Sequence, residues 1–208
     1  MEITSKLSPS ISKTLSQTYG LLAAMVMVTA LVSTTLVWAG FVLTNVTAAV
    51  VLMLVGFGLL FLTFSGNAVL ALGALLSFSV IKGIILTTLV SVTSTGLLLT
   101  ALILTFTIFA SLSGYVLLTG KDFTGWGNYL LGALILLVLT MVVGIFVELP
   151  ITQLAISWIT LLLFSGFILY DTSSIVEGEE TNPIVAALGL YLNLLNIFTS
   201  LINILKDD

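Results

Sequence analysis

Seven long apolar stretches, separated by short polar breaks, constrain this chain more than any other feature of its sequence. A helix that crosses the hydrocarbon core of a bilayer needs about 20 predominantly apolar residues, with a range of about 17–25. The stretches have that length, and they lie at residues 21–43, 47–64, 68–90, 97–118, 129–147, 151–176 and 183–205. The sequence therefore predicts an all-α integral membrane protein, a bundle of seven transmembrane helices.

The composition supports this class and excludes several kinds of chemistry. The chain is 59% hydrophobic and 7% charged, with a mean hydropathy of +1.31, which is more apolar surface than a soluble domain of 208 residues can bury. Cysteine, histidine and arginine are absent. There is no material for a disulfide, a thiolate or imidazole metal site, or a Ser-His-Asp triad, and no phosphate-binding or dinucleotide motif is present. We expect no catalytic residues, no cofactor and no metal, and five lysines in the whole chain argue against a nucleic-acid partner.

The few lysines predict the orientation of the chain in the membrane. Residues 1–18 are polar and carry two lysines, so we expect a short, mobile cytoplasmic tail ahead of a single seven-helix membrane domain, residues 19–208. The first apolar stretch is too long for a signal peptide and lacks an Ala-x-Ala cleavage site. With the N-terminus in the cytoplasm, Lys121 also falls inside and Lys206 falls outside, as the positive-inside rule favours. The C-terminus is then extracytoplasmic.

The last apolar stretch carries a stripe of small and amide residues. They recur at spacings of three and four, which places them on one face of a helix: Ala186, Gly189, Asn193, Asn196, Ser200 and Asn203. Amide groups in hydrocarbon are costly without partners, so this face is expected to meet protein and the helix to lie inside the bundle. Close packing alone explains the small residues. The asparagines either form interhelical hydrogen bonds or line a narrow polar path, and the sequence does not separate these two roles.

Asp171 is an ionisable residue placed well within a predicted span, where charge is expensive. It lies about 10 Å before Gly178 along its helix, and Asn193 lies about 15 Å into the next helix at 1.5 Å per residue. The turn at Glu177–Asn182 makes the two helices antiparallel, so both side chains are expected at similar depth. We interpret Asp171, Asn193 and Asn196 as a candidate gate that senses protons or a cation. The alternative is an interfacial acid that merely anchors its helix through hydrogen bonds to neighbouring hydroxyls.

Lys82 is the second charge placed inside a predicted span. It lies about 21 Å into its helix, in the outer half of the bilayer. We expect its side chain to extend outward, toward Glu148, with the ammonium at the membrane surface.

The turn between the last two stretches has recognisable helix-end residues. Gly178 is predicted to end the sixth helix, since glycine tolerates the left-handed conformation common at helix C-termini. Asn182 before Pro183 predicts the start of the seventh, with an amide cap followed by a proline where no amide hydrogen is needed.

The sequence around this turn resembles the Bax inhibitor family of membrane proteins. The resemblance is carried by Ser165–Asn182, which includes Tyr-Asp-Thr and Gly-Glu-Glu-Thr-Asn, and by Ile184–Phe198, which includes Leu-Tyr-Leu and two asparagines. The Gly-Lys-Asp-Phe loop at Gly120 is similar to the bacterial YccA-like branch of the family. The resemblance implies a seven-helix bundle in the cell inner membrane with the C-terminal helix central. It also implies a non-enzymatic binder and modulator of the membrane AAA protease FtsH.

Other members of the family are pH-sensitive calcium leak channels, in which the acid matching Asp171 pairs with a second acid on the last helix. Here that second position is Asn193, and the second helix has no basic residue where those members carry one. These departures favour the protease binder. The alternative implied by the resemblance is a pH-sensitive calcium or proton-linked leak channel gated at Asp171.

Overall fold

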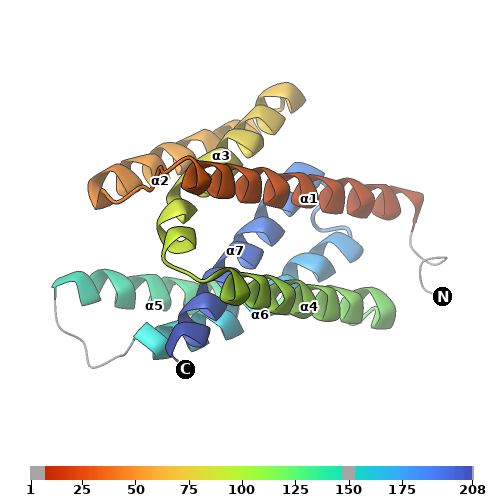
Figure 1. Cartoon of the computed structure of the whole chain (residues 1–208). Helices are drawn as coiled ribbons and strands as arrows, with labels where there is room; N and C mark the ends of the chain where they lie inside the picture. Colours follow the sequence, from red (N-terminus) through yellow and green to blue (C-terminus); the bar gives the residue numbers. More distant parts are fainter. Residues whose placement is uncertain (1–7, 147–152, 208) are drawn as a thin grey trace. The chain divides into compact units, whose positions relative to one another are not determined.

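Seven long helices make up the described part of the chain (Figure 1). The computed structural model describes residues 8–146 and 153–207, and within them it contains no strand. Every helix, α2 together with its 3-10 extension and α5 together with the 3-10 turn before it, is long and apolar enough to cross a bilayer. The predicted all-α membrane class is confirmed. The elements are α1 Pro9–Trp38, α2 Val46–Leu60, η1 Phe61–Phe64, α3 Ala68–Ser91, α4 Thr95–Thr119, η2 Thr124–Trp126, α5 Gly127–Phe146, α6 Gln153–Val176 and α7 Pro183–Asp207.

The first helix begins earlier than the hydropathy pattern predicts. α1 starts at Pro9, and residues 9–18, which we expected to be part of a mobile tail, form its first turns. Two features favour this start. Proline suits the first turn of a helix, and the Ser8 hydroxyl oxygen accepts a hydrogen bond from the backbone N–H of Ile11 (3.3 Å). Hydropathy marks where a helix enters hydrocarbon, and it does not mark where the helix begins.

The end of α1 is set by a glycine. Gly40 has φ +80°, and beyond it the N–H of Phe41 donates to the carbonyl of Leu36 (2.8 Å). This is the arrangement of a Schellman stop, which only glycine adopts without strain. The apolar run continues to Leu43, but the helix does not.

The chain forms two compact units. The first, which we call the α1–α3 unit, comprises residues 16–94 and 182–191. The second, the α4–α6 unit, comprises the described residues among 1–15, 95–181 and 192–208. α7 contributes residues to both units. It is the most enclosed of the seven spans, since 56% of an 18-residue apolar segment of α7 is buried, against 39% for α3 and α6 and 6% for α5. The predicted burial of the last helix is thus confirmed.

Tyr191 lies at the centre of the α1–α3 unit and is fully buried. Its hydroxyl group lies 2.6 Å from Thr29 Oγ1, and the Thr29 hydroxyl donates to the carbonyl of Ser79 (3.0 Å). The ring of Phe78 packs edge-on against Tyr191, with centroids 6.2 Å apart. One side chain of α7 therefore joins α1 and α3 through a short chain of hydroxyl contacts.

Two glycines allow close packing in the α4–α6 unit. A Cβ at Gly127 would lie 2.8 Å from the ring of Tyr170, and one at Gly166 would lie 2.9 Å from Leu130. α5 and α6 therefore approach more closely than larger side chains would permit, as is common between membrane helices. Ser113 on α4 and Thr172 on α6 add a buried hydroxyl pair 2.8 Å apart.

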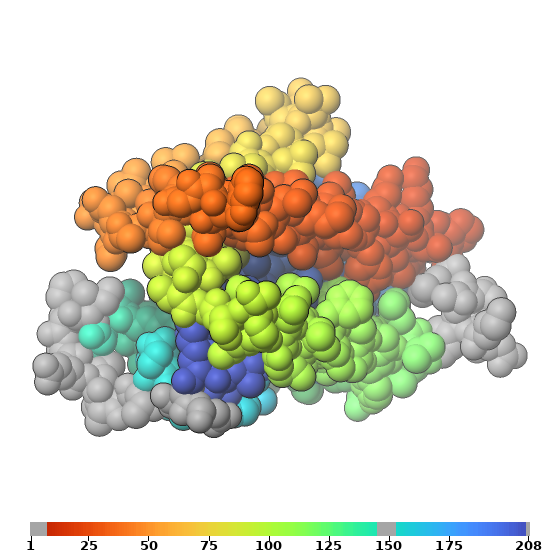
Figure 2. Space-filling model, in the orientation of Figure 1, coloured from red at the N-terminus to blue at the C-terminus, as the bar shows by residue number. Residues whose placement is uncertain are grey.

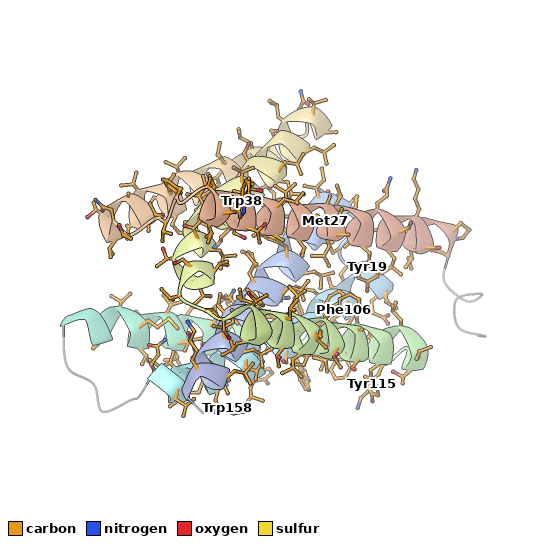
Figure 3. The ribbon with its side chains drawn as sticks, in the orientation of Figure 1. Tyr19, Met27, Trp38, Phe106, Tyr115 and Trp158 are labelled. Carbon is orange, nitrogen blue, oxygen red and sulfur yellow. The ribbon has the colours of Figure 1, made fainter. Side chains whose placement is uncertain are left out.

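The outer faces of the helices are apolar. Figure 2 shows the outward sides of α1 (red) and α4 (green), and Figure 3 marks Met27 and Trp38 on the first and Phe106 on the second. Their exposed fractions are 60%, 91% and 68%. Exposed apolar surface of this extent is what a lipid-facing helix requires, and it would be a liability in water.

Candidate functional site

The hairpin of α6 and α7 is built by the residues that the sequence singles out. Gly178 has φ +78° and follows the end of α6. The N–H of Glu179 donates to the carbonyl of Ser174 (2.9 Å), which completes a Schellman stop. Across the turn, the Asn182 side-chain oxygen accepts the N–H of Ile184 (3.0 Å) and caps α7. Both predicted helix ends are confirmed.

Asp171 and Asn193 meet directly across this hairpin. The Asn193 amide donates to the Asp171 carboxylate over 2.7 Å. Asn193 is 4% exposed and Asp171 is half-buried, so the contact lies inside the α4–α6 unit. The prediction that the two side chains share a depth is confirmed, and a bond to a charged acceptor is among the stronger hydrogen bonds.

Thr172, which follows Asp171 in the sequence, anchors the same turn of α6 to α4. Thr172 is fully buried, and its hydroxyl pairs with Ser113. Asp171 is also acted on electrostatically by Glu180, on the turn between α6 and α7. The Asp171 carboxylate is therefore hydrogen-bonded to the neutral amide of Asn193 and is influenced by the acidic Glu180. The helix turn that carries it is held in place by Thr172.

The other members of the α7 stripe behave differently from one another. The Asn196 amide donates to the carbonyl of Leu192 in its own helix (2.8 Å), and no hydrogen bond links it to Asp171 among the described residues. Ser200 is buried at 4% exposure, whereas Gly189 and Asn203 are half-buried. Among the described members of the stripe, Asn193 is therefore the one that is hydrogen-bonded to Asp171.

The buried surface of α7 is wider than the stripe. Four aliphatic residues outside the stripe are fully buried, at 0% exposure: Ala187, Leu190, Ile197 and Ile202. The Asn193 amide and these aliphatic side chains are enclosed alike. The periodicity of the stripe suggested that it would mark the protein-facing side of α7. Because residues outside the stripe are buried as well, it does not separate a protein-facing side from a lipid-facing side.

Tyr191, Thr29 and Ser79 were missed by the sequence analysis as interacting residues. Tyr191 is part of the Leu-Tyr-Leu run that carries the family resemblance, and this was its only signal. Threonine and serine in apolar helices usually bond to their own backbone, so Thr29 and Ser79 carry no signal in a single sequence.

The α4–α5 loop is attached to α6 by Ser173. Its hydroxyl oxygen accepts the N–H of Phe123 (3.1 Å), and its hydroxyl donates to the carbonyl of Lys121 (3.3 Å). Within the loop, the Asp122 carboxylate accepts the N–H of Thr124 (2.7 Å). That hydrogen bond lowers the pKa of Asp122 from its ordinary value, because it favours the charged form.

The Lys82 ammonium lies 5.5 Å from the centroid of the Phe78 ring. The half-buried side chain therefore has a cation–π partner one helical turn away on its own helix. The predicted partner, Glu148, lies outside the described residues.

The site consists of one acidic side chain and its amide partner among the described residues. Asp171 contacts an amide, and no nucleophile and base are paired there. Within residues 8–146 and 153–207, no group of three or more acidic side chains is placed to hold a metal ion. What the geometry provides is an acid that links two antiparallel helices inside a membrane bundle.

These features define a multi-pass helical membrane protein with an acidic contact at the hairpin of its last two helices. The sequence profile described as "Inhibitor of apoptosis-promoting Bax1" matches residues 11–208. The chain belongs to this Bax inhibitor family.

Several proteins are similar to this chain. One is the "Modulator of FtsH protease YccA" of Escherichia coli (strain K12), 38% identical over 202 residues, or 94% of this chain and 90% of that protein. An "Uncharacterized membrane protein" of Vibrio cholerae is 50% identical over 105 residues, covering 50% of this chain and 47% of that protein. A "Golgi anti-apoptotic protein" of vaccinia virus (strain Lister) is 32% identical over 133 residues, covering 64% of this chain and 56% of that protein.

Proposed function

We propose that this protein is a non-enzymatic modulator of a membrane AAA protease of the FtsH type. The observation that carries the proposal is its similarity, along 94% of the chain, to a protein described as a modulator of FtsH protease. The similarity covers 94% of this chain and 90% of that protein, so it is not confined to one segment.

The surfaces of α4 and α5 support binding by helix contact. Both helices are largely exposed, because only 17% and 6% of their apolar segments are buried. Each presents large exposed apolar side chains, such as Phe106 on α4 and Leu136 on α5. Association of helices within a bilayer depends on packing of this kind. The early start of α1 supports a second contact, because Pro9–Lys13 extends the helix with a polar and exposed surface.

The test is capture of the protease from membranes of the host cell. Tagged protein is crosslinked in intact membranes, solubilised and purified, and the protease is identified by mass spectrometry. Asp171→Asn is expected to capture the same amount, because its charge is bonded within the hairpin and is not offered to a partner. Absence of any AAA protease, with an unrelated tagged multi-pass protein as the baseline, would refute the proposal.

A second function, a cation leak gated at Asp171, is favoured by one observation. The Asp171 carboxylate is linked across the hairpin by the 2.7 Å bond to Asn193, with Glu180 acting on the same carboxylate. Loss of that bond would free an acid and an amide inside the bundle. The candidate gate consists of Asp171 and Asn193, with Asn196 one turn further along α7, and calcium or protons are the proposed ions.

Calcium flux into liposomes across neutral pH, with wild type beside Asp171→Asn, tests the leak. A pH-dependent flux that the substitution alters would support the leak. Flux equal to that of empty liposomes, or flux indifferent to the substitution, would refute it.

We further propose a location in the cell inner membrane with a cytoplasmic N-terminus and an extracytoplasmic C-terminus. Because the chain has no cysteine, single-cysteine variants can be labelled without removing native thiols. Ser8→Cys is expected to resist an impermeant maleimide applied to intact cells, and Lys206→Cys to react. The reverse pattern would overturn the orientation.

A further inference from the structure

The α4–α5 loop gathers a lysine and three aromatic side chains at one end of the α4–α6 unit. Lys121 is exposed, and Trp126, Tyr115 and Tyr129 are 47%, 43% and 81% exposed. Aromatic and basic side chains together are typical of the interface between a membrane and water.

The lysine and the tryptophan are held by one buried ring. The Lys121 ammonium lies 5.5 Å from the centroid of Phe123, and the Trp126 ring meets the same ring edge-on at 5.0 Å. Phe123 itself is 6% exposed. A cation and an indole N–H donor are therefore gathered around a fixed platform before any ligand arrives.

The backbone of the loop is fixed as well. Ser173 of α6 bonds both the N–H of Phe123 and the carbonyl of Lys121. Asp122 accepts the N–H of Thr124 inside the loop, so its carboxylate is engaged there. No carboxylate lies within ion-pair distance of the Lys121 ammonium in the part of the chain that the structure describes.

The acidic turn after α6 lies at a different depth. Ser173, which contacts the loop, precedes Glu177 by one helical turn, or about 6 Å along α6 at 1.5 Å per residue. Glu177, Glu179 and Glu180 therefore lie beyond the level of the loop, toward water. The loop backbone at Lys121 and Phe123 is therefore placed nearer the middle of the α6 span than these glutamates are.

We propose that the loop of residues 121–126 binds the headgroup of an anionic phospholipid. Lys121 supplies the positive charge that pairs with the phosphate, and Trp126 supplies an N–H donor and an apolar ring for the glycerol region. Phe123 and Ser173 are positioning residues. The occupant is a lipid because the cluster combines one unpaired cation with aromatic groups half exposed at a membrane interface.

The experiment uses the tryptophan of the loop as its reporter. The chain has three tryptophans, and the double variant W38F/W158F leaves Trp126 alone. The full-length protein is placed in vesicles of phosphatidylcholine mixed with phosphatidylglycerol, in which one lipid or the other carries brominated chains that quench nearby tryptophan. The ratio of the two quenching curves gives the relative affinity of the lipids at the loop.

Phosphatidylglycerol is expected to bind about five-fold more tightly than phosphatidylcholine at Trp126, as one lysine near an anionic surface provides. Lys121→Gln should reduce that ratio to about one, while the matched variant Lys206→Gln, at the far end of α7, should leave it unchanged. Trp158 provides a second control as the sole tryptophan in W38F/W126F. It lies near the start of α6, about 22 Å from Ser173 at 1.5 Å per residue, and Figure 3 shows it and Tyr115 toward opposite ends of the unit.

Four results would overturn the proposal. The first is equal quenching of Trp126 by both lipids in the unsubstituted chain. The second is a preference that survives Lys121→Gln. The third is a Trp126 that no brominated lipid reaches, which would mean that protein covers the loop. A five-fold preference at Trp158 as well would show a property of the whole membrane surface and would also refute a site at the loop.

Discussion

Gly83 offers the sharpest test of how the helices of the α1–α3 unit pack. A Cβ at this position of α3 would lie 2.8 Å from Cβ of Val32 and 2.9 Å from the carbonyl oxygen of Thr29, both on α1. Neither is the far end of a flexible side chain. Gly83→Ala must therefore push α1 and α3 apart rather than displace a rotamer.

The size of the effect follows from two opposing terms. Forcing an extra carbon into a packed interior costs about 1–3 kcal/mol. Replacing glycine by alanine within a helix returns up to about 1 kcal/mol through backbone entropy. Gly73 provides the matched control, since it lies on the same helix and a Cβ there meets nothing within 4 Å. The difference between Gly83→Ala and Gly73→Ala cancels the helix term and leaves about 1–3 kcal/mol of overpacking.

The assay is unfolding of the purified protein in mixed micelles by increasing SDS, followed by tryptophan fluorescence. Gly73→Ala is expected to be as stable as wild type or more stable, and Gly83→Ala to be less stable than Gly73→Ala. If the two variants unfold at the same SDS fraction, α1 and α3 do not approach each other as closely as the structure shows, and the reasoning fails.

Three further predictions concern polar contacts. Tyr191→Phe removes the hydroxyl that meets Thr29 at 2.6 Å, and it should cost about 0.5–1.5 kcal/mol in the same assay; an equal cost in a Thr29→Val background would show that the bond contributes nothing. Asp171→Ala leaves the buried amide of Asn193 without its acceptor and should cost about 1–3 kcal/mol, whereas Asp171→Asn keeps an acceptor and should cost less; equal losses would contradict this. Because the pKa of Asp122 is lowered in the folded loop, the stabilisation it provides is complete above its unfolded value and is lost as the pH falls through the folded value. The fluorescence emission of Trp126 in the loop should therefore change at a pH below the ordinary pKa of an aspartate. Asp122→Asn should abolish this change, and a change that persists in the variant would point to another titrating group.

The spans were predictable because the bilayer fixes their length and polarity. The boundaries were not, because they depend on local backbone chemistry that hydropathy ignores. Gly40 ends α1 while the apolar run continues, and Pro9 begins it inside a polar segment. The helix ends at Gly178 and Asn182 were predictable, since there the residue type itself performs the function of the cap.

The candidate site was predictable in part. The approach of Asp171 to Asn193 follows from counting residues on both sides of one turn, and the structure bears it out. Asn196 follows the same periodicity but bonds to its own helix, because an amide can choose between a neighbouring helix and its own backbone. The Tyr191–Thr29 contact joins residues far apart in sequence, and no local pattern in one chain encodes such a pairing.

An asparagine at position 193 allows the hairpin contact to persist when its partner is protonated, although the bond to a neutral acceptor is weaker. The amide donates an N–H to a carboxylate oxygen, and that oxygen remains an acceptor when the other oxygen is protonated. Two carboxylates at this distance would repel each other and would meet only while sharing a proton, so their contact would respond to pH. Asn193→Asp should create that response. We expect the variant to unfold at a lower SDS fraction than wild type at neutral pH and to gain more stability on acidification than wild type does. A variant whose stability follows wild type at every pH would show that the two side chains are not in contact, and it would remove the main geometric support for a gate at Asp171.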